Sequence, residues 1–346
     1  MPASRPTSPI RLYPLLVVLC AVAAPSSAFA GDAQRRDTGA FLFQWDNDKV
    51  VDTDRHYTNG MRIAYSFDTP TGQWKTTGAK LADWAWFSDA SALRAGWSLG
   101  QDMYTPEDVD TYTPDPLDRP YAGWTYLGFS VQNETADAQD TLEIDVGAIG
   151  PAARAGQLQN AFHRLINVSV SRGWRSQIGN EPGLLATRTY KLRADAKPVF
   201  GLNALQADVI GHGAAQLGNV RTAAALGATM RVGGNLKEDF GPVYGTFALP
   251  SARPSKLTYS LFAGAEARAV ARDIFLDGNT FKNSAHVKKN PYVLEGRIGI
   301  AAHTPLPPGW WASGVRLSVD MVHRTREFTT QDKADRYGSF QMTLNF

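Results

Sequence analysis

The sequence predicts an all-β fold, a transmembrane antiparallel β-barrel of about twelve strands with a helix in an extracellular loop. Three observations favour this fold class. From residue 38 onward, short segments of alternating apolar and polar residues are separated by turns rich in Gly, Pro, Asp and Asn. After residue 30, no segment approaches the roughly 18 continuous apolar residues that a membrane helix needs. The chain ends in an alternating segment, residues 340–346, whose last residue is aromatic.

The first thirty residues read as a secretory signal peptide. Two arginines precede an apolar stretch over residues 12–24, and a small-x-small cleavage site ends at Ala30. Cys20, the single cysteine, lies inside this segment, and the leucine before it is too large for a lipoprotein signal. We expect cleavage after Ala30, which leaves residues 31–346 as one outer-membrane barrel domain without a thiol.

The charge balance of the remaining chain narrows the class of partner. The sequence holds 35 Lys and Arg and 33 Asp and Glu, and two of the arginines belong to the signal segment. The exported chain is therefore formally neutral, which argues against nucleic acid as a partner. Nine Trp and twelve Tyr suffice for interfacial aromatic girdles. We expect a monomer in the bacterial outer membrane, in contact with outer-membrane lipids.

The strands follow from period-two alternation, with apolar residues facing lipid and polar residues such as Gln101, Glu143 and Asp145 facing the lumen. The expected strands cover residues 41–45, 61–67, 95–104, 121–134, 141–149, 185–193, 200–209, 222–232, 257–268, 292–302, 314–323 and 340–346. Residues 68–94 carry a candidate short amphipathic helix. An even strand number places both termini on the periplasmic side, so the connections after strands one, three and five open outside.

The first outer connection carries Asn47, Asp48 and Thr58. The amide, carboxylate and hydroxyl oxygens of these side chains are ligands that a hard cation prefers. An Asx-rich hairpin loop without a ligand is the simpler alternative.

The third outer connection is the long segment with helical character. A proline begins residues 151–166, which are rich in helix formers. Gln159 and His163 share one face at i and i+4, and a helix over the rim would turn that face towards Asn47, Asp48 and Thr58. Neutral imidazole is a competent general base, although an exposed histidine is the commoner case. His56 is a rival candidate in a less well held position.

Other polar residues near the outer rim are candidates for substrate binding. Arg119 ends the second outer connection, where its planar donors suit a phosphate or carboxylate, or an ion pair that fixes the loop. Trp174 and Gln177, with Asn180 and Glu181, close the third connection and line the site or order the loop.

The segment Gly96-Trp97-Ser98-Leu99-Gly100 matches the G-x-S-x-G pattern of serine hydrolases. That motif requires a sharp turn from a strand into a helix. Here the serine alternates with apolar residues inside an expected strand, so the sequence does not favour a serine nucleophile.

Together these motifs resemble the lipid A 3′-O-deacylase (LpxR) family of Gram-negative outer membranes. The matching pieces are Asn47-Asp48, Tyr57-Thr58 with Gly60, residues 101–106, Asp118-Arg119, residues 147–151, Gln159-Asn160, His163-Arg164, and Trp174 with Gln177. They keep the family order and similar spacing across most of the chain after residue 30.

The resemblance implies a twelve-stranded barrel with its active site between the outer rim and a loop helix. It implies Ca²⁺-dependent hydrolysis of the 3′ acyloxyacyl chain of lipid A in lipopolysaccharide. His163 would activate water, Ca²⁺ near Asn47 and Asp48 would stabilise the oxyanion, and Thr58 and Gln159 match further site positions. Some relatives carry an acidic residue six positions after the histidine, where this chain has a serine, and Glu181 is a candidate replacement.

We therefore predict a carboxylic ester hydrolase, a lipid A deacylase of the outer membrane. One alternative is an outer-membrane phospholipase that uses the same histidine, water and Ca²⁺ chemistry. The other is a non-enzymatic pore or structural barrel, which predicts a wide water-filled lumen.

Overall fold

A computed structural model describes residues 39–48, 56–68, 80, 83–85, 87, 93–165, 167, 169–241, 249 and 255–346. The predicted signal peptide lies outside the described residues. Within them, no helix is both long and apolar enough to cross a membrane.

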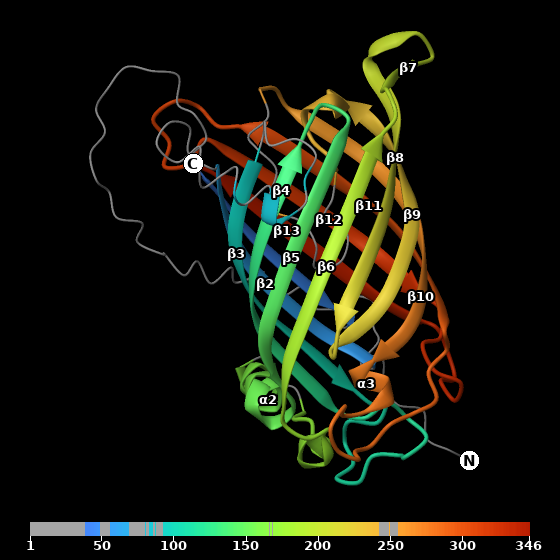
Figure 1. Ribbon diagram of the computed structural model, residues 1–346. Coiled ribbons are helices and arrows are strands. Elements are labelled where there is room, and N and C mark those ends of the chain that lie inside the picture. The colour runs from blue at the N-terminus through green and yellow to red at the C-terminus, as the bar shows by residue number, and fades with distance from the viewer. Residues whose placement is uncertain are drawn as a thin grey trace. The chain divides into compact units, whose positions relative to one another are not determined.

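The strands form a closed antiparallel barrel, as the sequence predicts (Figure 1). Its strands are β1 (Gly39–Asn47), β2 (His56–Asp68), β3 (Leu93–Thr105), β4 (Ala122–Glu134), β5 (Ala138–Ile149), β6 (Glu181–Arg193), β8 (Leu202–Gly218), β9 (Arg221–Gly234), β10 (Thr258–Asp273), β11 (Tyr292–Pro305), β12 (Gly314–Arg324) and β13 (Asp335–Asn345). Each pairs with its neighbours in chain order, and β1 with β13 and β6 with β8 close the ring. A thirteenth strand, β7 (Lys197–Val199), pairs only with β8 and is not part of the ring.

The outer and inner faces alternate along the strands. On β3, Trp97 and Leu99 are exposed, whereas Ser98 between them is buried and donates a hydrogen bond to Glu143 across 3.0 Å. The serine of the G-x-S-x-G segment therefore sits inside the barrel, within a strand. On β13, residues 340, 342 and 344 are half-buried, and residues 341, 343 and 345 are buried. This alternation is typical of a barrel with lipid outside and polar groups inside.

Charged side chains fill the interior. Nη2 of Arg62 lies 2.6 Å from Oε1 of Glu143, and both side chains are buried. Arg231 bridges strand and loop, because it pairs with Asp239 at 2.7 Å just after the short helix η4 (Leu236–Glu238). Ion pairs therefore connect strands and loops across the interior over the described residues, and the width of the lumen, which the pore alternative concerns, stays a prediction.

The connections after β1, β3 and β5 open at one end of the barrel, where the helices α2 (Ala155–Leu165) and α3 (Ile274–Asp277) also lie. Figure 1 shows these two helices at one end and the β7 hairpin at the other. We call the first end the helical end. The connection after β5 also contains the 3₁₀ helices η2 (Gly150–Ala153) and η3 (Gly173–Ser176).

The helix predicted over residues 151–166 is present but divided. Pro151 lies in η2, as a first-turn proline should. Arg154 then adopts a left-handed conformation, with φ of 55°, and α2 begins at the next residue. Of the helix predicted within residues 68–94, most lies outside the described residues; Asp83 and Trp84 are helical.

Candidate active site

Helix α2 packs on the outer wall of the barrel rather than over its lumen. Gly123 of β4 lies on the same face as Leu127, which is exposed on the outside of the barrel. A Cβ atom at Gly123 would lie 2.5 Å from the Cβ of Ala155, the first residue of α2. The missing side chain therefore lets the helix approach the wall closely, and Met103 of β3 and Trp174 pack with Ala155 in a small apolar cluster.

His163 is buried on the face of α2 that carries Gln159. Its Nδ1 atom lies 2.6 Å from the carbonyl oxygen of Ser169. A carbonyl only accepts hydrogen bonds, so Nδ1 carries the proton and donates it. The neutral imidazole is thereby fixed in the tautomer whose Nε2 lone pair is available as a base.

The segment that supplies the Ser169 carbonyl is itself held against α2. The side-chain amide of Asn160 donates to the carbonyl oxygen of Ser171 across 3.1 Å and accepts from the Ser171 backbone N–H across 2.9 Å. This chain therefore orients its histidine with a backbone carbonyl. Sequence reasoning missed this arrangement because a backbone acceptor leaves no signal in residue type.

Gln159 is held by Trp174. The indole Nε1–H of Trp174 donates to Oε1 of Gln159 across 2.6 Å, and Gly156 leaves room for the indole against the helix. The buried Nε2 of Gln159 meets no hydrogen-bond acceptor among the described residues. Since a buried amide N–H normally has a partner, this group is suited to receive a ligand oxygen. Gln177 donates to the Trp174 carbonyl across 2.9 Å, so the structure brings Gln159, Trp174 and Gln177 together, and their roles toward a substrate stay predictions.

The register of the sheet connects the first outer loop to the wall beneath α2. Asn47 pairs with Asn59 of β2, Asn59 with Met103 of β3, and Met103 with Gly123 of β4. At about 4.8 Å per strand, this row places Asn47 about 14 Å from Gly123, the residue of the wall that the start of α2 contacts. The register of β2 against β3 shifts between Tyr57 and Asn59, so Thr58 is the extra residue of a bulge. The side chains of Thr58 and His56 lie outside the described residues.

The side chains of Asn47 and Asp48 fit a calcium ion by the chemistry of their donors. Both side chains are buried at the end of β1, and an amide oxygen and a carboxylate are ligands that Ca²⁺ accepts. Within the described ranges, no cluster of three or more His, Cys, Asp or Glu side chains is arranged to hold a metal ion. Backbone carbonyls and water would have to complete the shell, as they commonly do for Ca²⁺.

Arg119 is buried in an ion pair. Its Nη1 atom lies 3.1 Å from Oε2 of Glu327, in the connection after β12, and its guanidinium stacks on the ring of Tyr104 at 4.6 Å. Burial raises the pKa of Glu327, but Arg324 and Arg119 lower it more, and the net result is a pKa of about 2. The geometry matches the loop-fixing alternative; contact between Arg119 and substrate stays a prediction.

Glu181 is held by hydrogen bonds from two other connections, and its role as a replacement ligand stays a prediction. Its carboxylate accepts hydrogen bonds from Asn219, Asn279 and the backbone N–H of Thr280, at 2.9 to 3.1 Å. It therefore ties the connection after β10 to the start of β6. Asn180 accepts from the backbone N–H of Ala152 across 2.6 Å and so orders the third connection.

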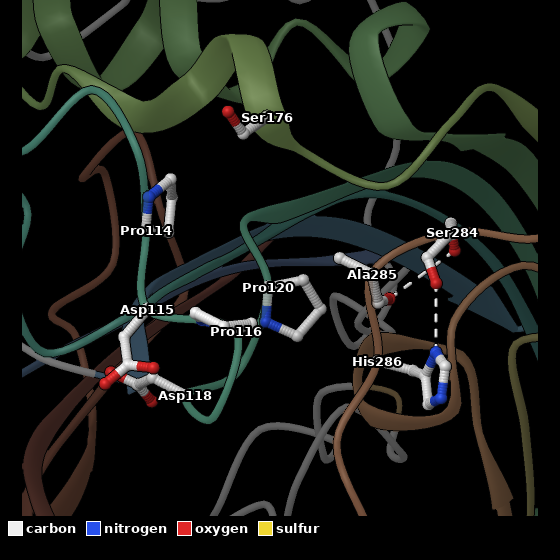
Figure 2. A pocket seen from close by; sticks show the side chains of 9 residues that line it. All are labelled: Pro114, Asp115, Pro116, Asp118, Pro120, Ser176, Ser284, Ala285 and His286. Carbon is white, nitrogen blue, oxygen red and sulfur yellow. Dashed lines mark hydrogen bonds between the residues drawn. The ribbon is translucent and has the colours of Figure 1, made fainter.

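A separate pocket of about 410 Å³ lies between the second outer connection and the one after β10 (Figure 2). Its polar groups serve the loops themselves: Asp118 accepts from the backbone N–H of Glu107, and His286 bonds to the carbonyl of Ser284 across 3.0 Å. None of the predicted site residues lines this pocket, so we place the candidate active site at α2.

Comparisons with known proteins agree with this architecture. A family profile described as "Outer membrane protein LpxR" matches residues 15–346. Among solved structures, LpxR from Salmonella typhimurium is similar with a TM-score of 0.71 and 22% identity, over 89% of this chain and 100% of that one. The β domain of the Bordetella autotransporter BrkA is similar with a TM-score of 0.39 and 9% identity, over 89% of this chain and 97% of that one. No curated protein sequence matches the chain.

Proposed function

The chain belongs to the LpxR family of outer-membrane proteins, and from this premise we propose that it hydrolyses the ester-linked 3′ acyloxyacyl chain of lipid A. The proposal rests on one observation: a general base, His163, and a hydrogen-bond donor, Gln159, lie together on the outer side of the barrel wall. His163 presents Nε2, and Gln159 presents an unsatisfied N–H group, on one buried face of α2. A substrate in the membrane would approach from that side.

In the proposed reaction, Nε2 of His163 takes a proton from water, and the water oxygen attacks the ester carbonyl carbon. Negative charge then builds on the carbonyl oxygen, where the Nε2–H of Gln159 donates a hydrogen bond. Collapse breaks the bond to the alkoxy oxygen, and the imidazolium returns its proton to that leaving group. The products are a free acyloxyacyl acid and a hydroxyl on the sugar.

The Ser169 carbonyl supports both steps. It keeps Nδ1 protonated, so only Nε2 exchanges the proton, and it stabilises the imidazolium that forms. Asn47 and Asp48 would hold Ca²⁺, which when bound would supply positive charge to stabilise a developing oxyanion. Trp174 keeps the Gln159 amide oriented with its N–H group free for the substrate.

The test is mass spectrometry of lipid A from cells that express the wild type or His163→Ala, with folding of both confirmed by heat-modifiable gel mobility. We expect loss of a 3′ acyloxyacyl group with the wild type alone. Wild-type trimming by His163→Ala would refute the base assignment. Unchanged lipid A together with new lysophospholipid would instead identify a phospholipase.

A further inference from the structure

We propose that the exposed face of α2 and the arginines around it form a surface that inserts into a leaflet of phosphate-bearing glycolipid. The surface consists of Leu158, Phe162 and Leu165 with Arg154, Arg164, Arg172 and Arg175, and we call it the leaflet surface. The choice of glycolipid rests on the proposed function; the insertion itself does not.

Helix α2 has inverted amphipathicity. Its polar residues Gln159 and His163 are about 4% and 3% exposed, whereas Leu158, Phe162 and Leu165 are 42%, 43% and 79% exposed. In a helix that borders water, the apolar stripe faces the protein. The reverse arrangement indicates that the medium outside α2 is apolar.

The leaflet surface continues the lipid-facing belt of the barrel. Along β4, Leu127 is 55% exposed on the outside, and Gly123, two periods of the alternation further towards the helical end, contacts the start of α2. On the neighbouring strand β3, Trp97 and Leu99 are also exposed on the outside. The helix therefore begins where the belt ends, at the level at which acyl chains meet headgroups.

The segment that contains α2 carries only basic charge, although the backbone N–H of Arg172 donates to the carbonyl of Val109, between the acidic residues Asp108 and Asp110. Residues 150–180 contain four arginines and no aspartate or glutamate. All four arginines are exposed, and none forms an ion pair with an acidic side chain in the part of the chain that the structure describes. Arg172 stacks on the ring of Tyr112 at 5.6 Å. Guanidinium groups above an apolar stripe suit a lipid that carries phosphate over acyl chains, since arginine forks onto phosphate oxygens.

The experiment measures the depth of a nitroxide label, which does not depend on hydrolysis. In a Cys20→Ser background, single cysteines replace Leu165, Leu127 as a lipid-facing control, or Lys333, an exposed residue at the helical end, as a water-facing control. The labelled proteins are reconstituted into vesicles, and collision with oxygen is compared with collision with a water-soluble nickel chelate. We expect the Leu165 label to match the Leu127 label. A match to the Lys333 label would overturn the insertion, and a label at Phe162 provides a second measurement.

Lipid composition tests the choice of glycolipid. Vesicles of phosphatidylcholine are compared with vesicles that also contain lipid A, or phosphatidylglycerol at equal charge. We expect the Leu165 label to lie deepest with lipid A, and Arg164→Gln with Arg175→Gln to remove that increment. Equal depth with phosphatidylglycerol would overturn the commitment to glycolipid. An inserted label in a protein that leaves lipid A intact would refute the proposed function and keep the leaflet surface.

Discussion

Replacement of Gly123 by alanine tests whether the enzymatic activity depends on the position of α2 against the barrel wall. The new Cβ would lie 2.5 Å from the Cβ of Ala155, whereas ordinary contact begins at 3.4 Å. The helix start must therefore move outward by about 1 Å. A displacement of that size in groups that position a reaction costs about 100-fold in rate, and overpacking costs about 1–3 kcal/mol of stability.

The assay is the rate of lipid A deacylation in membranes, normalised to the heat-modifiable folded form on gels. Gly211→Ala is a matched control, because a Cβ at Gly211 on the wall of β8 meets no atom within 4 Å. We expect Gly123→Ala to lose most of the activity with the barrel folded, and Gly211→Ala to retain it. Full activity of folded Gly123→Ala would refute the reasoning.

Three further outcomes are expected. Trp174→Phe keeps an aromatic ring but removes the N–H group that donates to Gln159. Because one buried hydrogen bond is lost, kcat/KM should fall about 10-fold while folding is unchanged. An unchanged kcat/KM would contradict the positioning role of Trp174. The pKa of Glu327 is lowered to about 2 by Arg324 and Arg119 together, so these charge interactions stabilise the protein above the usual pKa of 4.5. Their joint contribution, on the order of 3 kcal/mol, should be lost as the pH falls from 4.5 to 2. Thermal unfolding against pH measures it, and Glu327→Gln should lack that pH-dependent part. EDTA should abolish deacylation and Ca²⁺ restore it, while Asp48→Asn should raise the Ca²⁺ concentration required; activity that survives EDTA would remove the metal from the mechanism.

The alternation of apolar and polar residues along the sequence determines most of the strands of the barrel. Because the side-chain period of a strand is two, alternation such as Trp97, Ser98 and Leu99 specifies both the strand and the face that meets lipid. The sequence also placed helix formers, Gln159 and His163 in the third outer connection. Such features depend on neighbours along the chain, and these were confirmed.

Only the tertiary structure decided what surrounds those residues. The proton on Nδ1 of His163 follows from the carbonyl of Ser169, and backbone acceptors are invisible in a sequence. The partner of Arg119 is Glu327, 208 residues away along the chain, and barrel closure brings the two together. The place of α2 on the outer wall depends on Gly123 meeting Ala155, a contact between a strand and a helix that only the folded chain brings together. Periodicity determines which way each side chain points; closure of the ring determines what it meets.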